Sequence, residues 1–188
     1  IASTGGDTIN VNATTATDTT TIDAFTGDDA NTMTINGDGL SADDLFVGNT
    51  GTDRFVLNVT TNLGATGVFP LTSLEIRGDD PTGSFTRDSL EILDASGAAR
   101  DLVFDYQDSA GDVDVESGAG GGLGAGAEDI PVFVRTMETL IYRGGAGNND
   151  QVRIEGTTAD DDLTVAPLST SAAVVFLNGN PWDGPGDG

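Results

Sequence analysis

Carboxylates are the side chains of this 188-residue sequence with the most scope for chemistry, because the residues that other reactions need are missing. The chain has no Cys and no His, and its seven basic residues are all arginines. Without His, Cys or Lys there is no Ser-His-Asp triad, no thiol nucleophile, no Schiff base and no histidine metal site. We therefore predict that the protein is not an enzyme.

Clustered aspartates could bind a hard cation, and Ca²⁺ is the cofactor that we expect if there is one. Calcium takes six to eight oxygen ligands, and a local pair of carboxylates supplies part of that shell. Aspartate also bonds its own backbone in tight turns, so turn capping is the competing interpretation. The predicted metal ligands are Asp79, Asp80, Asp150, Asp160, Asp161 and Asp162.

The segment from Gly144 to Val152 differs by one inserted residue from the Gly-Gly-x-Gly-x-Asp-x-apolar repeat that binds Ca²⁺ in β-roll proteins. That motif coordinates metal between stacked consecutive copies. Because the chain carries a single degenerate copy, the sequence argues against a tight β-roll.

An enzymatic alternative remains, in the form of a calcium-dependent polysaccharide lyase in which an arginine abstracts a proton. Arg77 and Arg143 are the candidates, since each stands at the end of a predicted strand beside a turn rich in Gly or Asp. The competing interpretation is that these arginines pair with nearby carboxylates and relieve charge.

Two Asn-x-Thr acceptor patterns predict glycosylation sites at Asn12 and Asn58. The same pattern arises often by chance in a Thr-rich chain. In a secreted protein, glycans at these positions would help to keep an edge strand from pairing wrongly.

The net charge of −24 limits the partners and the environment. Nucleic acid is excluded because binding a phosphate backbone needs clustered basic residues, and the seven arginines are scattered. No apolar run is long enough for a membrane span. The acidic, Lys-free, Cys-free and Thr-rich composition predicts an extracellular or cell-surface location, with a halophilic cytoplasm as the other source of such acidity.

Short blocks of Val, Ile, Leu, Phe and Thr recur between clusters of Gly, Asp and Asn, which is typical of all-β proteins. No window offers a helical stripe, so helix content should be close to nil. The predicted strands are 8–12, 20–24, 32–36, 45–48, 54–59, 73–77, 89–93, 102–106, 112–116, 130–135, 139–143, 151–155, 163–166 and 173–178.

We predict an all-β fold of short strands, either a β-helix or solenoid-like repeat fold or an antiparallel β-sandwich of the jelly-roll or Ig-like kind. Residues 1–116 form an N-terminal β region, 117–128 a Gly-rich loop and 129–188 a C-terminal β region, unless the chain is one continuous domain. The repeated units favour the solenoid, whereas the irregular period and the long central gap favour the sandwich.

The repeat is a strand, a Gly turn and a second strand opened by Asp. It is seen in residues 72–92, where Leu-Glu-Ile-Arg-Gly-Asp-Asp precedes Asp88, and again in residues 138–154, where Leu-Ile-Tyr-Arg-Gly-Gly precedes Asp150. The stretch 149–165, with Gly156-Thr-Thr and Asp160 to Val165, resembles the GT–DD–LTV repeats of large secreted or surface proteins of bacteria. That resemblance implies an adhesive or matrix role.

The C-terminal strand at 173–178 has no charge and no clean alternation, so both its faces should be covered. It is interpreted either as a central core strand or as a strand that pairs with a neighbouring subunit. Together these features predict an extracellular structural protein, a self-assembling subunit of a fibre, sheath or matrix that forms homo-oligomers or polymers through strand edges. A carbohydrate-binding or adhesin module is the alternative.

Overall fold

The computed structural model describes the chain over residues 5–14, 20–23, 30–40, 43–48, 51–60, 74–78, 88–95, 101–106, 112–117, 132–137, 139–144, 150–158, 160–161, 163–169 and 172–177. Within these ranges the chain is almost entirely β-strand, and the only helix is the three-residue 3₁₀ turn Gly37–Gly39. The predicted all-β class is thereby confirmed. None of the described residues forms a helix with the length and apolar character that a membrane span requires.

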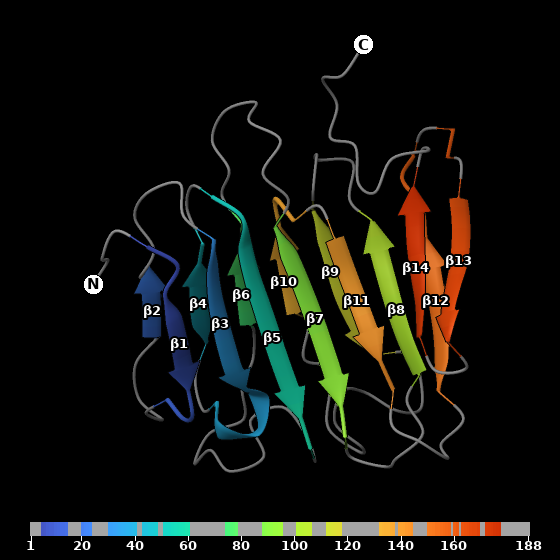
Figure 1. Ribbon diagram of the computed structural model, residues 1–188. Coiled ribbons are helices and arrows are strands. Elements are labelled where there is room, and N and C mark those ends of the chain that lie inside the picture. The colour runs from blue at the N-terminus through green and yellow to red at the C-terminus, as the bar shows by residue number, and fades with distance from the viewer. Residues whose placement is uncertain are drawn as a thin grey trace.

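The strands form two seven-stranded sheets. Sheet A has the order β1-β3-β5-β7-β11-β14-β13, and sheet B has the order β12-β8-β9-β10-β6-β4-β2. Figure 1 shows the two sheets lying face to face along the length of the molecule. The strands of sheet A are β1 (Thr8–Val11), β3 (Asn31–Asn36), β5 (Asp53–Val59), β7 (Ser89–Asp94), β11 (Thr139–Arg143), β14 (Ala172–Leu177) and β13 (Leu163–Ser169). Those of sheet B are β12 (Gln151–Glu155), β8 (Asp101–Tyr106), β9 (Val113–Ser117), β10 (Val132–Arg135), β6 (Leu74–Arg77), β4 (Asp44–Val47) and β2 (Thr20–Asp23).

Through its first six strands the chain alternates strictly between the sheets. We call one strand of sheet A together with the following strand of sheet B a coil. Neighbouring coils pair in parallel, as β1 with β3 and β3 with β5 in sheet A, and β2 with β4 and β4 with β6 in sheet B. The sheet A strands of these coils begin at Thr8, Asn31 and Asp53, an almost constant interval.

The alternation is interrupted twice later in the chain. In sheet B, β8, β9 and β10 follow one another, and β9 runs antiparallel to both of its neighbours. In sheet A, β14 runs antiparallel to β11 and to β13. Strands from either side of the predicted Gly-rich loop share both sheets, because β10 pairs with β6, β11 with β7 and β12 with β8.

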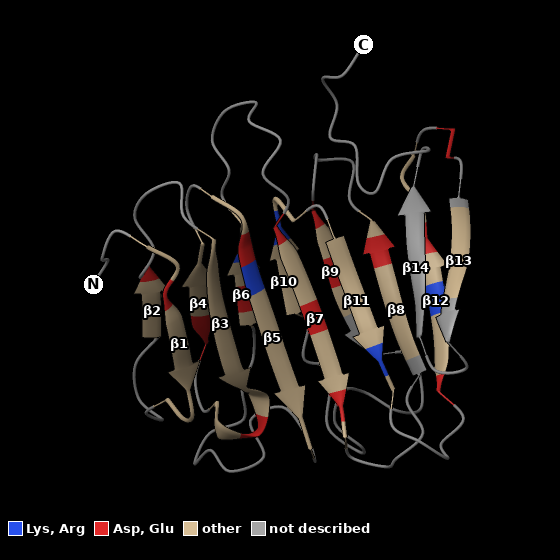
Figure 2. Cartoon of the chain, viewed as in Figure 1, with Lys and Arg blue, Asp and Glu red and all other residues tan. Residues whose placement is uncertain are grey.

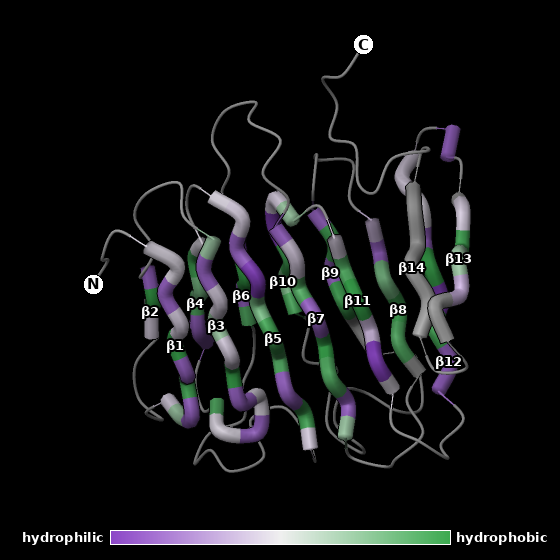
Figure 3. Tube along the Cα trace, in the orientation of Figure 1, coloured by the Kyte–Doolittle hydropathy of each residue, from purple (hydrophilic) through white to green (hydrophobic). Residues whose placement is uncertain are grey.

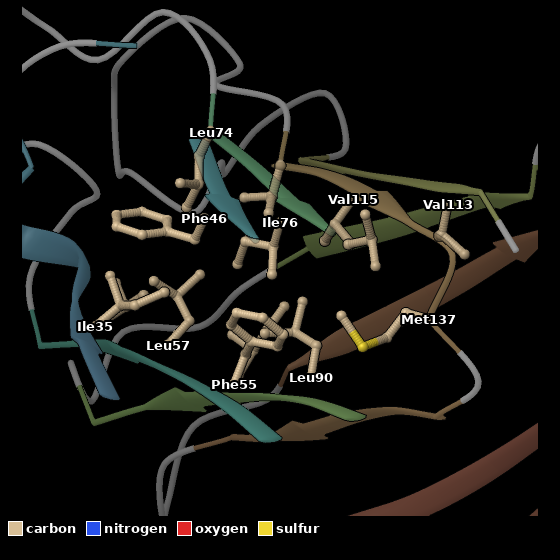
Figure 4. Close-up of a cluster of buried hydrophobic side chains, with 14 of the residues drawn as sticks. Ile35, Phe46, Phe55, Leu57, Leu74, Ile76, Leu90, Val113, Val115 and Met137 are labelled. Carbon is tan, nitrogen blue, oxygen red and sulfur yellow. The ribbon is translucent and has the colours of Figure 1, made fainter. Parts of the chain in front are cut away.

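The core lies between the sheets and is built by the strict alternation of side chains along each strand. Met33 and Ile35 of β3 point inward, and Phe55, Leu57 and Val59 of β5 do the same in the next coil. Figure 4 shows Ile35, Phe55 and Leu57 facing Phe46, Leu74 and Ile76 from sheet B, with Met137 beside Leu90. In Figure 3 the hydrophobic positions recur along every strand of the regular coils.

Candidate functional site

The most ordered polar feature of the structure is a row of side chains where the strands of sheet A begin. We call Asn31, Asp53 and Asp88 the Asx ladder. Asp7 N donates to Asn31 Oδ1 at 2.9 Å, Asn31 N donates to Asp53 Oδ1 at 3.2 Å, and Asp53 N donates to Asp88 Oδ1 at 2.7 Å. Each side chain therefore caps the backbone amide of the coil before it.

The ladder lies in the interior. Asp53 and Asp88 are both 0% exposed. The Asn31 side-chain amide also donates to Asp53 Oδ1 at 2.9 Å, and Asp53 Oδ2 has no hydrogen-bond partner among the described residues. Burial raises the pKa of Asp53 to about 6, although both bonds from Asn31 favour the ionised form. The ladder thus carries a carboxyl group that titrates close to neutral pH.

The repeated geometry of the strand–Gly–Asp unit explains the sequence repeat. A Cβ atom on Gly48 would lie 2.7 Å from Asp53 Oδ2, and Cβ atoms on Gly78, Gly144 and Gly156 would collide with the carboxylates of Asp88, Asp150 and Asp161. In every case the aspartate that opens one strand folds back over the glycine that follows the previous strand. Gly is favoured at these positions because a Cβ atom would occupy the space of the carboxylate unless the aspartate moved.

The predicted metal ligands fall into three groups. Asp79, Asp80 and Asp162 lie outside the described residues. Asp150 accepts a hydrogen bond from the Tyr142 hydroxyl at 3.0 Å, and exposed Asp161 accepts one from the Thr157 hydroxyl at 3.0 Å. Asp160 is exposed. Among the residues described there is no group of three or more acidic side chains that could hold a metal ion, so the structure does not bring Asp150, Asp160 and Asp161 together.

Two further acidic residues, Asp44 and Asp38, accept hydrogen bonds from threonine amides and hydroxyls. Asp44 is 3% exposed, accepts the Thr14 hydroxyl at 2.9 Å and accepts the Thr20 amide at 3.1 Å. Burial raises its pKa despite these bonds. Asp38 accepts both the amide and the hydroxyl of Thr60.

The two predicted glycosylation sites lie in one row at the ends of the sheet A strands. Asn12 is exposed, Asn58 is half-buried, and Asn36, which pairs with Asn58, lies between them and donates to the Asn12 carbonyl at 3.1 Å. The threonine of each acceptor pattern, Thr14 or Thr60, donates its hydroxyl to a buried aspartate. Both threonines therefore have a structural use in the folded chain.

Five of the seven arginines lie among the described residues, and each forms an ion pair. Arg54 and Arg143 both bond Glu91, which is 8% exposed on the outer face of sheet A. The other pairs are Arg77 with Glu75, Arg135 with Asp114 at 2.7 Å, and Arg153 with Glu155 at 2.8 Å. Figure 2 shows these basic positions interspersed with acidic ones. The lyase candidates Arg77 and Arg143 are thus engaged with carboxylates, as the charge-relief interpretation predicts.

Glu91 has no local sequence signature, because nothing in the sequence places Arg54, Arg143 and Glu91 together. Burial alone would raise its pKa, but the hydrogen bonds from Arg143 and Arg54 outweigh that and lower it. The Asx ladder had a partial signal, since Asp53 and Asp88 each open a predicted strand.

The C-terminal strand β14 pairs with β11 on one edge and with β13 on the other. Its edges are therefore used within the chain, as the interpretation of a central strand requires, and the outer edge of sheet A is β13. Trp182 lies outside the described residues.

No family model, curated protein or solved structure matches the chain.

Proposed function

We propose that this chain is an extracellular structural subunit, built as a two-sheet β-solenoid of largely parallel strands, which self-associates through strand edges into a fibre, sheath or matrix. The proposal rests on the strands at the ends of the two sheets, each of which pairs with a neighbouring strand on one side only. Among the described residues β1 and β2 have no partner on their outer edges at one end, and β13 and β12 have none at the other. Unpaired edges are templates for pairing with another chain.

The polar groups support a structural role over a catalytic one. The buried aspartates Asp53, Asp88 and Asp44 hold backbone amides of neighbouring coils. Arg77 and Arg143, the two candidates for a catalytic base, are each held by a glutamate. These groups keep successive coils in register, which is what a load-bearing or space-filling subunit needs.

The charge sets the conditions for assembly. Copies that each carry a charge of −24 repel one another, and added salt or divalent cations screen that repulsion. We infer that Ca²⁺ promotes association chiefly by neutralising the carboxylates of the surface. An extracellular medium supplies both salt and calcium, which fits the proposed location.

Electron microscopy with sedimentation velocity tests the function. The full chain is compared in three buffers: low salt, about 150 mM salt, and about 150 mM salt with about 1 mM Ca²⁺. Filaments or sheets that grow with ionic strength support the proposal. Monomers under every condition overturn it, and release of unsaturated products from an acidic polysaccharide would favour the lyase instead.

A further inference from the structure

The four strands at the ends of the sheets all run in the direction that a continuing parallel sheet requires. In sheet A, β1, β3, β5, β7 and β11 are parallel, and the single reversed strand β14 is followed by β13, which regains the direction of β1. In sheet B the single reversed strand is β9, and β12 again runs in the direction of β2. The arrows in Figure 1 show both cases.

The two ends are also level. Within the described residues each sheet has seven strands, so the two sheets have the same number of strand positions between their ends. Each sheet also contains one reversed strand, β14 in sheet A and β9 in sheet B. A second copy placed end to end would therefore meet both edge strands at once.

The side chains at the two ends match in character. Val152 of β12 is 44% exposed and Val165 of β13 is 53% exposed, and these are the exposed large apolar residues of the described chain. Val152 pairs with buried Leu102, so it lies on the core side of sheet B. At the other end, Ile9 of β1 and Ile22 of β2 are only partly buried against the core. Each end thus exposes the apolar edge of an unfinished core.

The register of sheet A brings Val165 and Ile9 to the same level. Val165 pairs with Val175, and the pairing of Ala173 with Tyr142 sets Val175 opposite Leu140. Leu140 is level with Leu90, Phe55, Met33 and finally Ile9. A straight continuation of the sheet would therefore place Val165 against Ile9 of the next copy, and Thr164 against Thr8.

We propose that copies of this chain stack head to tail, with β13 pairing in parallel with β1 of the next copy and β12 with β2 of that same copy. This inference rests on the proposed function and specifies its geometry. The facing segments of sheet A, Thr8–Val11 and Leu163–Ser169, contain no charged residue. Charged side chains are one of the features by which edge strands avoid association, and these two segments have none. Pro167 limits the contact to the part of β13 that precedes it.

Cysteine cross-linking tests the pairing, because the chain has no cysteine of its own. Thr8→Cys protein is mixed with Thr164→Cys protein under mild oxidation. Neighbouring strands lie about 4.8 Å apart, which is within disulfide range. Both threonines are exposed, so each variant should fold. The control mixture combines Thr164→Cys with Thr34→Cys, which lies on β3 within sheet A.

The head-to-tail arrangement predicts at least a five-fold higher yield of mixed disulfide dimer for the first mixture than for the control. Equal yields in samples that still form filaments overturn this arrangement and leave the proposed function standing. Monomers in both mixtures and in the parent protein overturn both.

A proline variant gives a second test. Asp7 O accepts from Thr32 N at 2.8 Å, so in the parallel ladder the amide of Asn10 points away from β3, toward the free edge. Asn10→Pro should lower the assembled fraction at least ten-fold while Asn10→Ala leaves it unchanged, with circular dichroism confirming that both fold. Equal assembly of the two variants would contradict pairing through β1.

Discussion

The same strand–Gly–Asp unit has different surroundings in the inner coils and at the C-terminal end. In the inner coils the aspartate is enclosed, as Asp53 and Asp88 are, and the inward apolar residues Phe55 and Leu57 are completely buried. At the other end Asp161 is exposed beside Gly156, and Val152 and Val165 are largely exposed. The unit has the same local geometry in both places. What differs is that an inner coil has neighbours on two sides and the last coil on one.

This comparison implies that stability is concentrated in the inner coils and that the two ends contribute less. In repeat structures, stability is approximately a sum of repeat terms and nearest-neighbour interfaces. Four pairs of variants test this inference. In each pair one substitution lies in the inner coils and the other lies nearer the end or the surface, and the two changes in stability are compared.

The largest effect is expected for the core. Phe55→Ala should lower the free energy of unfolding by about 3–5 kcal/mol, because it leaves a cavity in a fully enclosed site. Val152→Ala should change it by less than about 0.5 kcal/mol, because the side chain is 44% exposed. Urea unfolding followed by circular dichroism measures both. Similar losses at the two sites would refute the contrast.

The turn glycines come next. Gly78→Ala should destabilise the protein by about 2–3 kcal/mol, because the new Cβ would collide with the backbone oxygen of Thr136 as well as with the buried Asp88. Gly156→Ala meets only exposed Asp161, whose side chain can swing away, and should cost less than about 1 kcal/mol. Thermal unfolding of the two variants decides the order. A larger loss for Gly156→Ala would contradict the account.

The Asx ladder predicts a pH-dependent stability. The folded pKa of Asp53 is about 6 and its ordinary value is 3.8, so its contribution is fully present below pH 3.8 and is lost as the pH rises to about 6. Asp53→Asn should therefore stabilise the protein by about 2 kcal/mol at pH 7 and by far less at pH 4. Asn already occupies the equivalent position of the preceding coil, at Asn31.

Urea unfolding of Asp53→Asn and of the parent chain across pH 4 to 7 gives this difference. Asp160→Asn, which changes an exposed carboxylate, is the matched control and should shift stability by less than about 0.5 kcal/mol at either pH. A gain for Asp53→Asn that is the same at pH 4 and pH 7 would show that Asp53 does not titrate in this range.

The smallest effect is expected for ion pairs. Glu91→Gln should lower stability by about 1 kcal/mol at pH 7, since Glu91 is largely buried between Arg54 and Arg143. Because the pKa of Glu91 is lowered, its contribution is present above its ordinary value of 4.5 and is lost as the pH falls below it. Glu155→Gln breaks only the exposed pair with Arg153 and should have almost no effect. Equal losses of stability for the two variants would show that the buried ion pairs of Glu91 are no stronger than the exposed pair of Glu155.

Local chemistry made the strands predictable. Each of the fourteen strands overlaps a predicted one, because alternating apolar residues and Gly or Asp turns act over a few positions. The arrangement into two sheets could not be read off in that way. The strand–Gly–Asp units at Arg77-Gly78 and Arg143-Gly144 have similar sequences. The first nevertheless connects β6 of sheet B to β7 of sheet A, whereas the second connects β11 of sheet A to β12 of sheet B.

The candidate sites were less accessible to prediction for the same reason. Asp before a strand was recognised as a turn signal, but its burial depends on whether a coil lies on both sides. The contacts of Glu91 join residues far apart in the sequence, and they depend on the register of β5, β7 and β11. Register is a property of the whole sheet and leaves no local signature.

The axial repeat of the assembled filaments is the decisive measurement for head-to-tail stacking. Seven strands per sheet at about 4.8 Å each predict a rise of about 34 Å per subunit, with strands perpendicular to the filament axis. Fibre diffraction or helical reconstruction should therefore show a meridional spacing near 4.8 Å together with that rise. Filaments whose strands run along the axis, or a protein that stays monomeric in calcium and salt, would contradict the account.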